Sequence, residues 1–129
     1  MVLNHIHQLS YMKTTNKHFE LFKKECNYWL DKLKLDDFEA NYYHENISYN
    51  KADASVSADY KYRRADFTFS IDDFDKDTFN DEYIKNTAKH EVLHLLVGEM
   101  KDLAQDRYII KDEIIKADER LIRKLEKLL

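Results

Sequence analysis

The sequence predicts a single α+β domain, in which one helix precedes three strands and two helices follow them. Apolar residues recur with the period of a helix in residues 16–33, 81–97 and 111–129, whereas they alternate with polar residues between 38 and 71. The 129 residues include no proline and one glycine, so flexible linkers are not expected. About a quarter of the chain is Leu, Ile, Val or Phe, which is enough for one core spanning residues 1–129.

The amino-acid composition of the chain indicates which classes of binding partner to expect. The chain has 25 acidic and 21 basic residues, a formal net charge of −4, whereas a nucleic-acid interface is usually basic. No apolar run is long enough to span a membrane, and residues 1–12 lack the basic start of a signal peptide. Cys26 is the only cysteine, which excludes an internal disulfide. We therefore expect a cytoplasmic protein that binds neither nucleic acid nor membranes.

The first predicted helix, residues 16–33, has one apolar stripe. Its members are Phe19, Phe22, Cys26, Trp29, Leu30 and Leu33. Thr14, Thr15 and Asn16 are all suitable N-cap residues, because each side chain can accept a hydrogen bond from a free backbone N–H. The apolar positions form a single helical stripe, which is typical of an amphipathic helix.

Three strands are predicted next. Phe38, Ala40 and Tyr42 alternate with polar residues, and the same period continues in residues 52–58 and 65–71. Since each strand keeps one polar face, we expect a sheet that is covered on one side only.

The segment 72–82 contains six acidic residues and one lysine. It lacks the regular spacing of a calcium-binding EF-hand loop, so we interpret it as a solvated loop that favours the N-terminus of the next helix. That helix is predicted over residues 81–97, with Gly98 as its C′ residue at a positive φ. A last amphipathic helix is predicted over residues 111–129.

The predicted helix 81–97 contains the motif H-E-x-x-H, formed by His90, Glu91 and His94. A spacing of four places both imidazoles on one face of a helix, where both can bind one metal ion. Glu91 lies about 100° around the helix from His90, so its carboxylate can reach a water at the metal without ligating it. The pattern indicates zinc-dependent hydrolysis, with Glu91 as the general base.

A catalytic zinc site usually has a third protein ligand. No histidine follows His94, and Cys26 is far upstream, so a downstream ligand has to be Asp or Glu. The candidates are Glu99, Asp102, Asp106, Asp112, Glu113, Asp118, Glu119 and Glu126. At 100° per residue, Asp118 lies inside the apolar face of the last helix, Glu119 lies on its flank, and Glu113 and Glu126 lie on opposite flanks. Periodicity leaves Asp118 and Glu119 both open.

The chain resembles the small zincin-like metallopeptidases found among phage and prophage proteins. The resemblance covers the opening helix with Trp29, the run 59–65 that enters a strand, the motif segment 90–96 and the closing segment 119–125. It implies a minimal zincin-like fold, a cofactor Zn²⁺ held by His90, His94 and Glu119, and a bacterial host cell as the place of action. It also implies that the strand at residues 65–71 lies along the active-site cleft as an edge strand and pairs with an extended substrate.

We expect a zinc metallopeptidase that hydrolyses a peptide or protein substrate. Tyr108, between the two last helices, is the first candidate to stabilise the oxyanion. The alternative is a zinc-binding phage structural or regulatory protein without turnover, which uses the same ligands but leaves Glu91 without a task.

Overall fold

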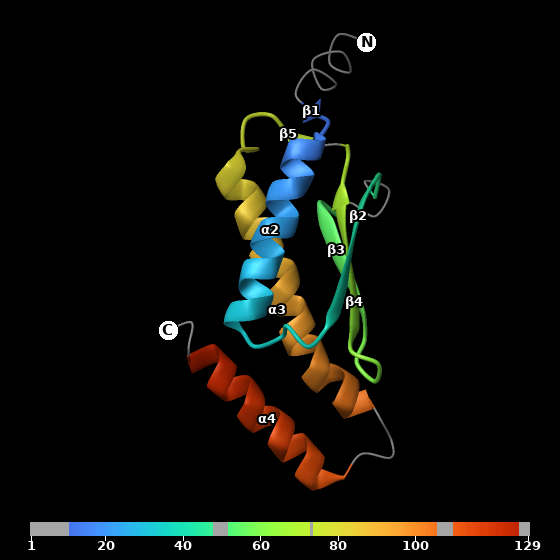
Figure 1. The fold of residues 1–129 in the computed structure, drawn as a ribbon, viewed down its shortest axis with the longest axis vertical. Helices are drawn as coiled ribbons and strands as arrows, with labels where there is room; N and C mark the ends of the chain where they lie inside the picture. The colour runs from blue at the N-terminus through green and yellow to red at the C-terminus, as the bar shows by residue number, and fades with distance from the viewer. Residues whose placement is uncertain (1–10, 48–51, 73, 106–109, 127–129) are drawn as a thin grey trace.

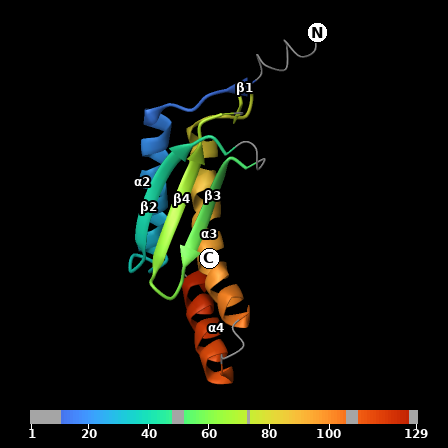
Figure 2. The same cartoon turned by 90° about the vertical axis from the view of Figure 1, so that its right-hand side faces the viewer.

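The computed structural model describes residues 11–47, 52–72, 74–105 and 110–126. It is an α+β structure in which a small sheet lies against two helices, and a further helix extends beyond the end of the sheet (Figures 1 and 2). The elements in chain order are β1 (Tyr11–Met12), α2 (Asn16–Lys32), β2 (Glu39–Glu45), β3 (Ala54–Asp59), β4 (Arg64–Ser70), β5 (Phe74–Asp75), α3 (Asp81–Gln105) and α4 (Lys111–Glu126). The predicted order of one helix, three strands and two helices is confirmed, and the short strands β1 and β5 are additional.

Helix α2 begins where the capping residues predicted it. Thr15 is the N-cap: its hydroxyl accepts from the backbone N–H of His18, whose ring in turn accepts from the Thr15 N–H. The buried residues of α2 are Phe22, Cys26 and Leu30, all members of the predicted stripe. Phe22 stacks on Phe69 of the sheet at a centroid distance of 4.7 Å, so α2 is anchored on the sheet.

The three-stranded sheet has the order β2-β4-β3. Strand β4 is parallel to β2 and antiparallel to β3, and Phe67 lies opposite both Tyr42 and Val56. The expectation that the strand at residues 65–71 forms an edge along the cleft is therefore wrong. The physical reason is that Ala65, Phe67 and Phe69 are fully buried, and β4 has a hydrogen-bonded neighbour on each side.

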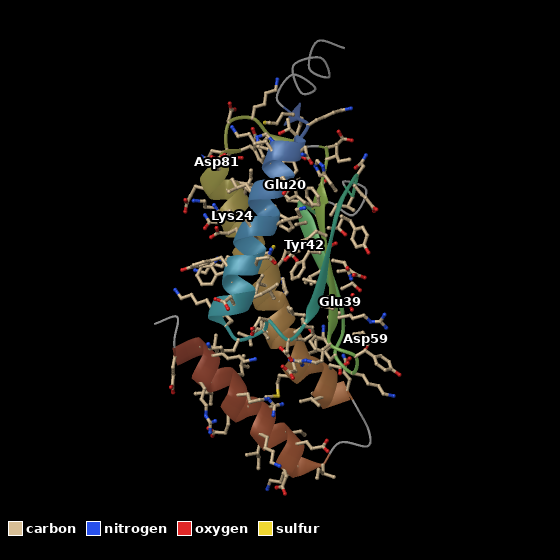
Figure 3. All side chains as sticks on the ribbon, in the orientation of Figure 1. Glu20, Lys24, Glu39, Tyr42, Asp59 and Asp81 are labelled. Carbon is tan, nitrogen blue, oxygen red and sulfur yellow. The ribbon has the colours of Figure 1, made fainter. Side chains whose placement is uncertain are left out.

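The sheet is covered on one side, as predicted. The inward side chains of β4 pack under α2 and α3, whereas its outward residues Arg64 and Asp66 are exposed. On β2, Tyr42 points toward α2, where its hydroxyl donates to Asn27 Oδ1 at 2.6 Å (Figure 3). The hydrophobic core thus lies between the sheet and the two helices.

Helix α3 continues through Gly98 to Gln105, so the predicted end at residue 97 and the positive φ at Gly98 are both wrong. The glycine instead permits a close approach. The hydroxyl of Tyr60 donates to the carbonyl of Leu95 at 3.0 Å and lies where a Cβ of residue 98 would be. Gly98 is therefore a packing position inside the helix rather than its terminus.

An ionic cluster connects α4 to the rest of the structure. Arg63 bonds to Asp37 at 2.8 Å and to Glu99 of α3 at 3.0 Å, and its guanidinium lies 3.9 Å from the centroid of the Phe38 ring. Arg120 of α4 approaches the same Glu99 oxygen at 3.8 Å. The predicted last helix is confirmed as α4 over the described residues, and Ala117 is its buried residue.

The acidic segment after β4 forms a connection that the sequence did not predict in detail. Its residues 74 and 75 pair as β5 with β1. The side chain of Asn80 accepts from the backbone N–H of Tyr83 at the start of α3. Among the described residues, no helix combines the length and the hydropathy that crossing a membrane requires.

Candidate functional site

His90 and His94 lie one turn apart on the exposed side of α3. Their Nε2 atoms are 3.0 Å apart and their rings meet edge to face. Two nitrogens that bind one tetrahedral zinc at 2.0–2.1 Å would be about 3.3 Å apart, so the pair is close to the geometry of two ligands of one ion. The predicted pairing of the two imidazoles is thus present in the structure.

Glu91 lies between the histidines and the core. Glu91 is only 7% exposed, and this burial raises the pKa of its carboxyl from 4.5 to about 7. Among the described residues no ion pair includes Glu91. The site therefore holds a carboxyl group that is a stronger base than an exposed glutamate.

Cys26 of α2 faces the core side of α3. Its thiol approaches the carbonyl of Ala88 at 4.0 Å, and the residue is fully buried. Burial, followed by the charge of Glu91, raises the pKa of the thiol. Cys26 is therefore a core residue that does not reach the exposed histidines.

A groove runs between α3 and the edge strand β3, which Figure 2 shows in front of α3. It consists of two adjoining hollows of about 450 Å³ and 370 Å³, both lined by Ala54 and Glu91. His94 lines the larger hollow, and His90 lines the smaller one. The strand beside the motif is thus β3 rather than the strand at residues 65–71.

Two tyrosines connect the walls of the groove. In the larger hollow, Tyr60 reaches across to Leu95 as described above. In the smaller hollow, the hydroxyl of Tyr83 on α3 donates to the carboxylate of Asp53, just before β3. Burial, and then the hydrogen bond to Asp53, raise the pKa of Tyr83 to about 12. Sequence reasoning missed these residues, because alternation in β3 does not reveal that it is an edge strand beside α3.

Among the described residues, the structure does not bring a third ligand to the histidines. Helix α4 packs on α3 around Leu96 and Met100, and Leu96 points about 160° away from His94 around the helix axis. Glu99 is engaged by Arg63. The other acidic candidates that the structure describes are exposed: Asp102, Asp112, Glu113, Asp118, Glu119 and Glu126. Asp106 and Tyr108 lie outside the described residues.

Accordingly, no group of three His, Cys, Asp or Glu side chains within the described residues is placed to hold a metal ion. The chain matches no protein-family model, no curated protein and no solved structure. The candidate site therefore consists of His90, Glu91 and His94 in a groove beside β3, and its interpretation depends on this geometry.

Proposed function

We propose that the chain is a zinc-dependent metallopeptidase with a minimal zincin-like fold. One observation carries the proposal: the Nε2 atoms of the two imidazoles are 3.0 Å apart on α3, and Glu91 lines both hollows of the groove beside them. His90 and His94 would hold the zinc, which when bound supplies a Lewis acid for the scissile carbonyl. Glu91 would take the proton of the attacking water and transfer it to the leaving amine.

Among the described strands β3 pairs only with β4, so its other edge offers a place for the substrate. Strand β3 pairs with β4 on one side, and its other side borders the groove. An extended peptide could add to this edge through backbone hydrogen bonds and place side chains in the two hollows. This geometry supports a peptide or protein substrate that crosses the site beside Glu91.

Glu119 is the proposed third ligand. In the described structure it is exposed on α4, so that helix would have to shift for the carboxylate to reach the histidines. Over the described residues, the contacts of α4 comprise one buried residue, Ala117, partly buried neighbours such as Leu121, and the approach of Arg120 to Glu99. Zinc titration of Glu119→Gln tests the assignment, with Glu126→Gln on the same helix as the matched control. A ligand role predicts a loss of affinity of at least about tenfold for Glu119→Gln alone.

The experiment that tests the function compares metal content with turnover. Elemental analysis should give about one zinc per chain, and a quenched-fluorescent peptide library should report cleavage. Glu91→Gln should retain zinc and lose turnover, whereas His90→Ala/His94→Ala should lose both. Glu82→Gln, an exposed acid in the first turn of α3, should change neither.

Two results would contradict the proposal. Retention of all zinc in the double histidine variant would exclude the histidines as ligands. Zinc binding together with unchanged biological activity in Glu91→Gln would favour a zinc-binding structural or regulatory protein without turnover.

A further inference from the structure

The two hollows of the groove between α3 and β3 differ in chemical character. The larger hollow is lined by Val56 and Ala58 on the strand side and by Val97 on the helix side, where Val97 is 51% exposed although it is aliphatic. The smaller hollow contains mainly polar side chains, among them those of Asp53, Tyr83, Asn86 and Thr87. Because Glu91 lines both hollows, a peptide that crosses the site would place different kinds of side chain on either side of it.

Asp53 is the charged group on the strand side of the smaller hollow. It lies in the bend just before β3, is half-buried, and accepts a hydrogen bond from the hydroxyl of Tyr83, which holds the carboxylate at the wall of the hollow. A carboxylate has about four acceptor sites, so it can bind further donors. No ion pair among the described residues includes Asp53. After burial and this hydrogen bond, the charges of Asp53 and Asp75 also raise the pKa of Tyr83, which indicates a negative potential at this end of the groove.

The lysines of α3 nearest in sequence to this hollow point away from it. At 100° per residue, Lys85 and Lys89 lie about 160° and about 120° around the helix from Tyr83. Lys89 lies instead over the ring of Trp29, 4.8 Å from its centroid. These lysines therefore do not neutralise the smaller hollow.

The larger hollow has a cation of its own. Lys101 lines it, and among the described residues that line the two hollows there is no other lysine and no arginine. A cationic side chain of a peptide is thus attracted to the smaller hollow and repelled from the larger one. An aliphatic side chain suits the larger hollow, because Val56 and Val97 offer it apolar contacts.

We propose that the smaller hollow is a subsite for a lysine or arginine side chain of the peptide substrate, and that Asp53 determines this specificity. The inference rests on the proposed peptidase function and names its substrate class, namely peptides in which a basic residue adjoins an apolar residue at the scissile bond. The basic side chain donates hydrogen bonds to the Asp53 carboxylate, and such charge-assisted bonds are stronger than neutral ones.

Three capped, quenched-fluorescent nonapeptides test the inference with the zinc-loaded chain. Their centres are Leu-Lys-Leu, Leu-Gln-Leu and Leu-Glu-Leu within serine, so that leucine can enter the larger hollow in either direction of the peptide. The wild type should cleave the lysine peptide with a kcat/KM about tenfold above that of the glutamine peptide, and the glutamate peptide most slowly.

Substitutions of Asp53 should change this order. Asp53→Asn keeps an oxygen that accepts from Tyr83 and should abolish the preference for lysine, whereas Asp53→Lys should invert it toward the glutamate peptide. Asp66→Asn is the matched control, because it makes the same change on the exposed outer face of the sheet, and it should retain the preference. Circular dichroism of each variant checks that the fold is retained.

A binding measurement separates the subsite from the peptidase function. In EDTA, fluorescence anisotropy of the same peptides with a single fluorophore should give the same order of dissociation constants, and the differences should decrease as salt is added. This order without any cleavage would contradict the peptidase and support the subsite. Cleavage without a preference for lysine, or with a preference that Asp53→Asn retains, would overturn the subsite alone. Equal affinities for all three peptides together with no cleavage would overturn both.

Discussion

Replacement of Gly98 by alanine should destabilise the chain, and the sign of this effect should depend on Tyr60. Alanine inside a helix is favoured over glycine by about 1 kcal/mol. Here, however, the new methyl group would lie 3.1 Å from Cζ of Tyr60 and would overlap its hydroxyl. The ring must move, which breaks the hydrogen bond to Leu95 and disturbs its edge-to-face contact with Phe38.

The size of the destabilisation by Gly98→Ala is the sum of three contributions. The lost hydrogen bond costs about 1 kcal/mol, and overpacking costs typically 1–3 kcal/mol. After the helix-propensity gain of about 1 kcal/mol, Gly98→Ala should lower the free energy of unfolding by about 1–3 kcal/mol. In a Tyr60→Ala background the three atoms that lie nearest to the methyl group are gone, so Gly98→Ala should raise the free energy of unfolding by up to about 1 kcal/mol.

Urea unfolding followed by far-UV circular dichroism of the four proteins gives this double-mutant cycle. Tyr60→Phe should give an intermediate effect, because it removes the hydroxyl and leaves Cζ in place. Equal stabilisation by Gly98→Ala in both backgrounds would refute the packing role of Gly98. Equal destabilisation in both would indicate that the residue needs a positive φ, as the sequence suggested.

Three further substitutions have expected outcomes. In EDTA, the raised pKa of Glu91 means that its carboxyl binds a proton more tightly in the folded chain than in the unfolded chain. The protonated carboxyl therefore contributes to the free energy of unfolding at low pH, and this contribution is lost as the pH rises from 4.5 through about 7. In Glu91→Gln the free energy of unfolding, measured by urea unfolding between pH 4 and 8, should no longer fall by about 3 kcal/mol over this range. An unchanged dependence of this free energy on pH would contradict the burial of the carboxyl. Lys34 is exposed at a φ of 59°, so Lys34→Gly should raise the melting temperature by relieving about 1 kcal/mol of strain; a lower value would refute this. Thr15→Ala should cost about 1 kcal/mol by removing the cap of α2, and an Asn replacement should restore most of it.

The elements of the fold could be predicted from the sequence, but the order of the strands could not. The alternation of Ala65, Phe67 and Phe69 with polar residues predicts which face of the strand is buried, and this prediction was correct. It does not state how many neighbours the strand has, because hydrogen-bond partners depend on residues far away in the chain. The parallel pairing of β2 with β4 places Tyr42 beside Phe67, a contact that no local pattern encodes.

The candidate site also has one part that depends on local sequence and one part that depends on contacts between distant segments. The pairing of His90 with His94 follows from helix geometry alone, so spacing was sufficient to predict it. A ligand from α4 depends on how that helix docks, and its apolar face is broad enough to dock in more than one way. Periodicity placed Asp118 within that face. In the structure α3 covers the side around Ala117 instead, and Asp118 is exposed.

Glu91 shows how one helix serves both the core and the groove. Its neighbours Val92 and Leu95 are buried in the core, while His90 and His94 on the other side of α3 are exposed. A carboxyl group at this boundary loses solvation, and such a loss destabilises the charged form unless a partner compensates it. Burial is the cause of its raised pKa, and no ion pair in the described part of the chain includes it. An apolar residue would fill this position at lower cost, so the carboxyl is better explained by the proposed role beside the histidines than by a contribution to folding stability.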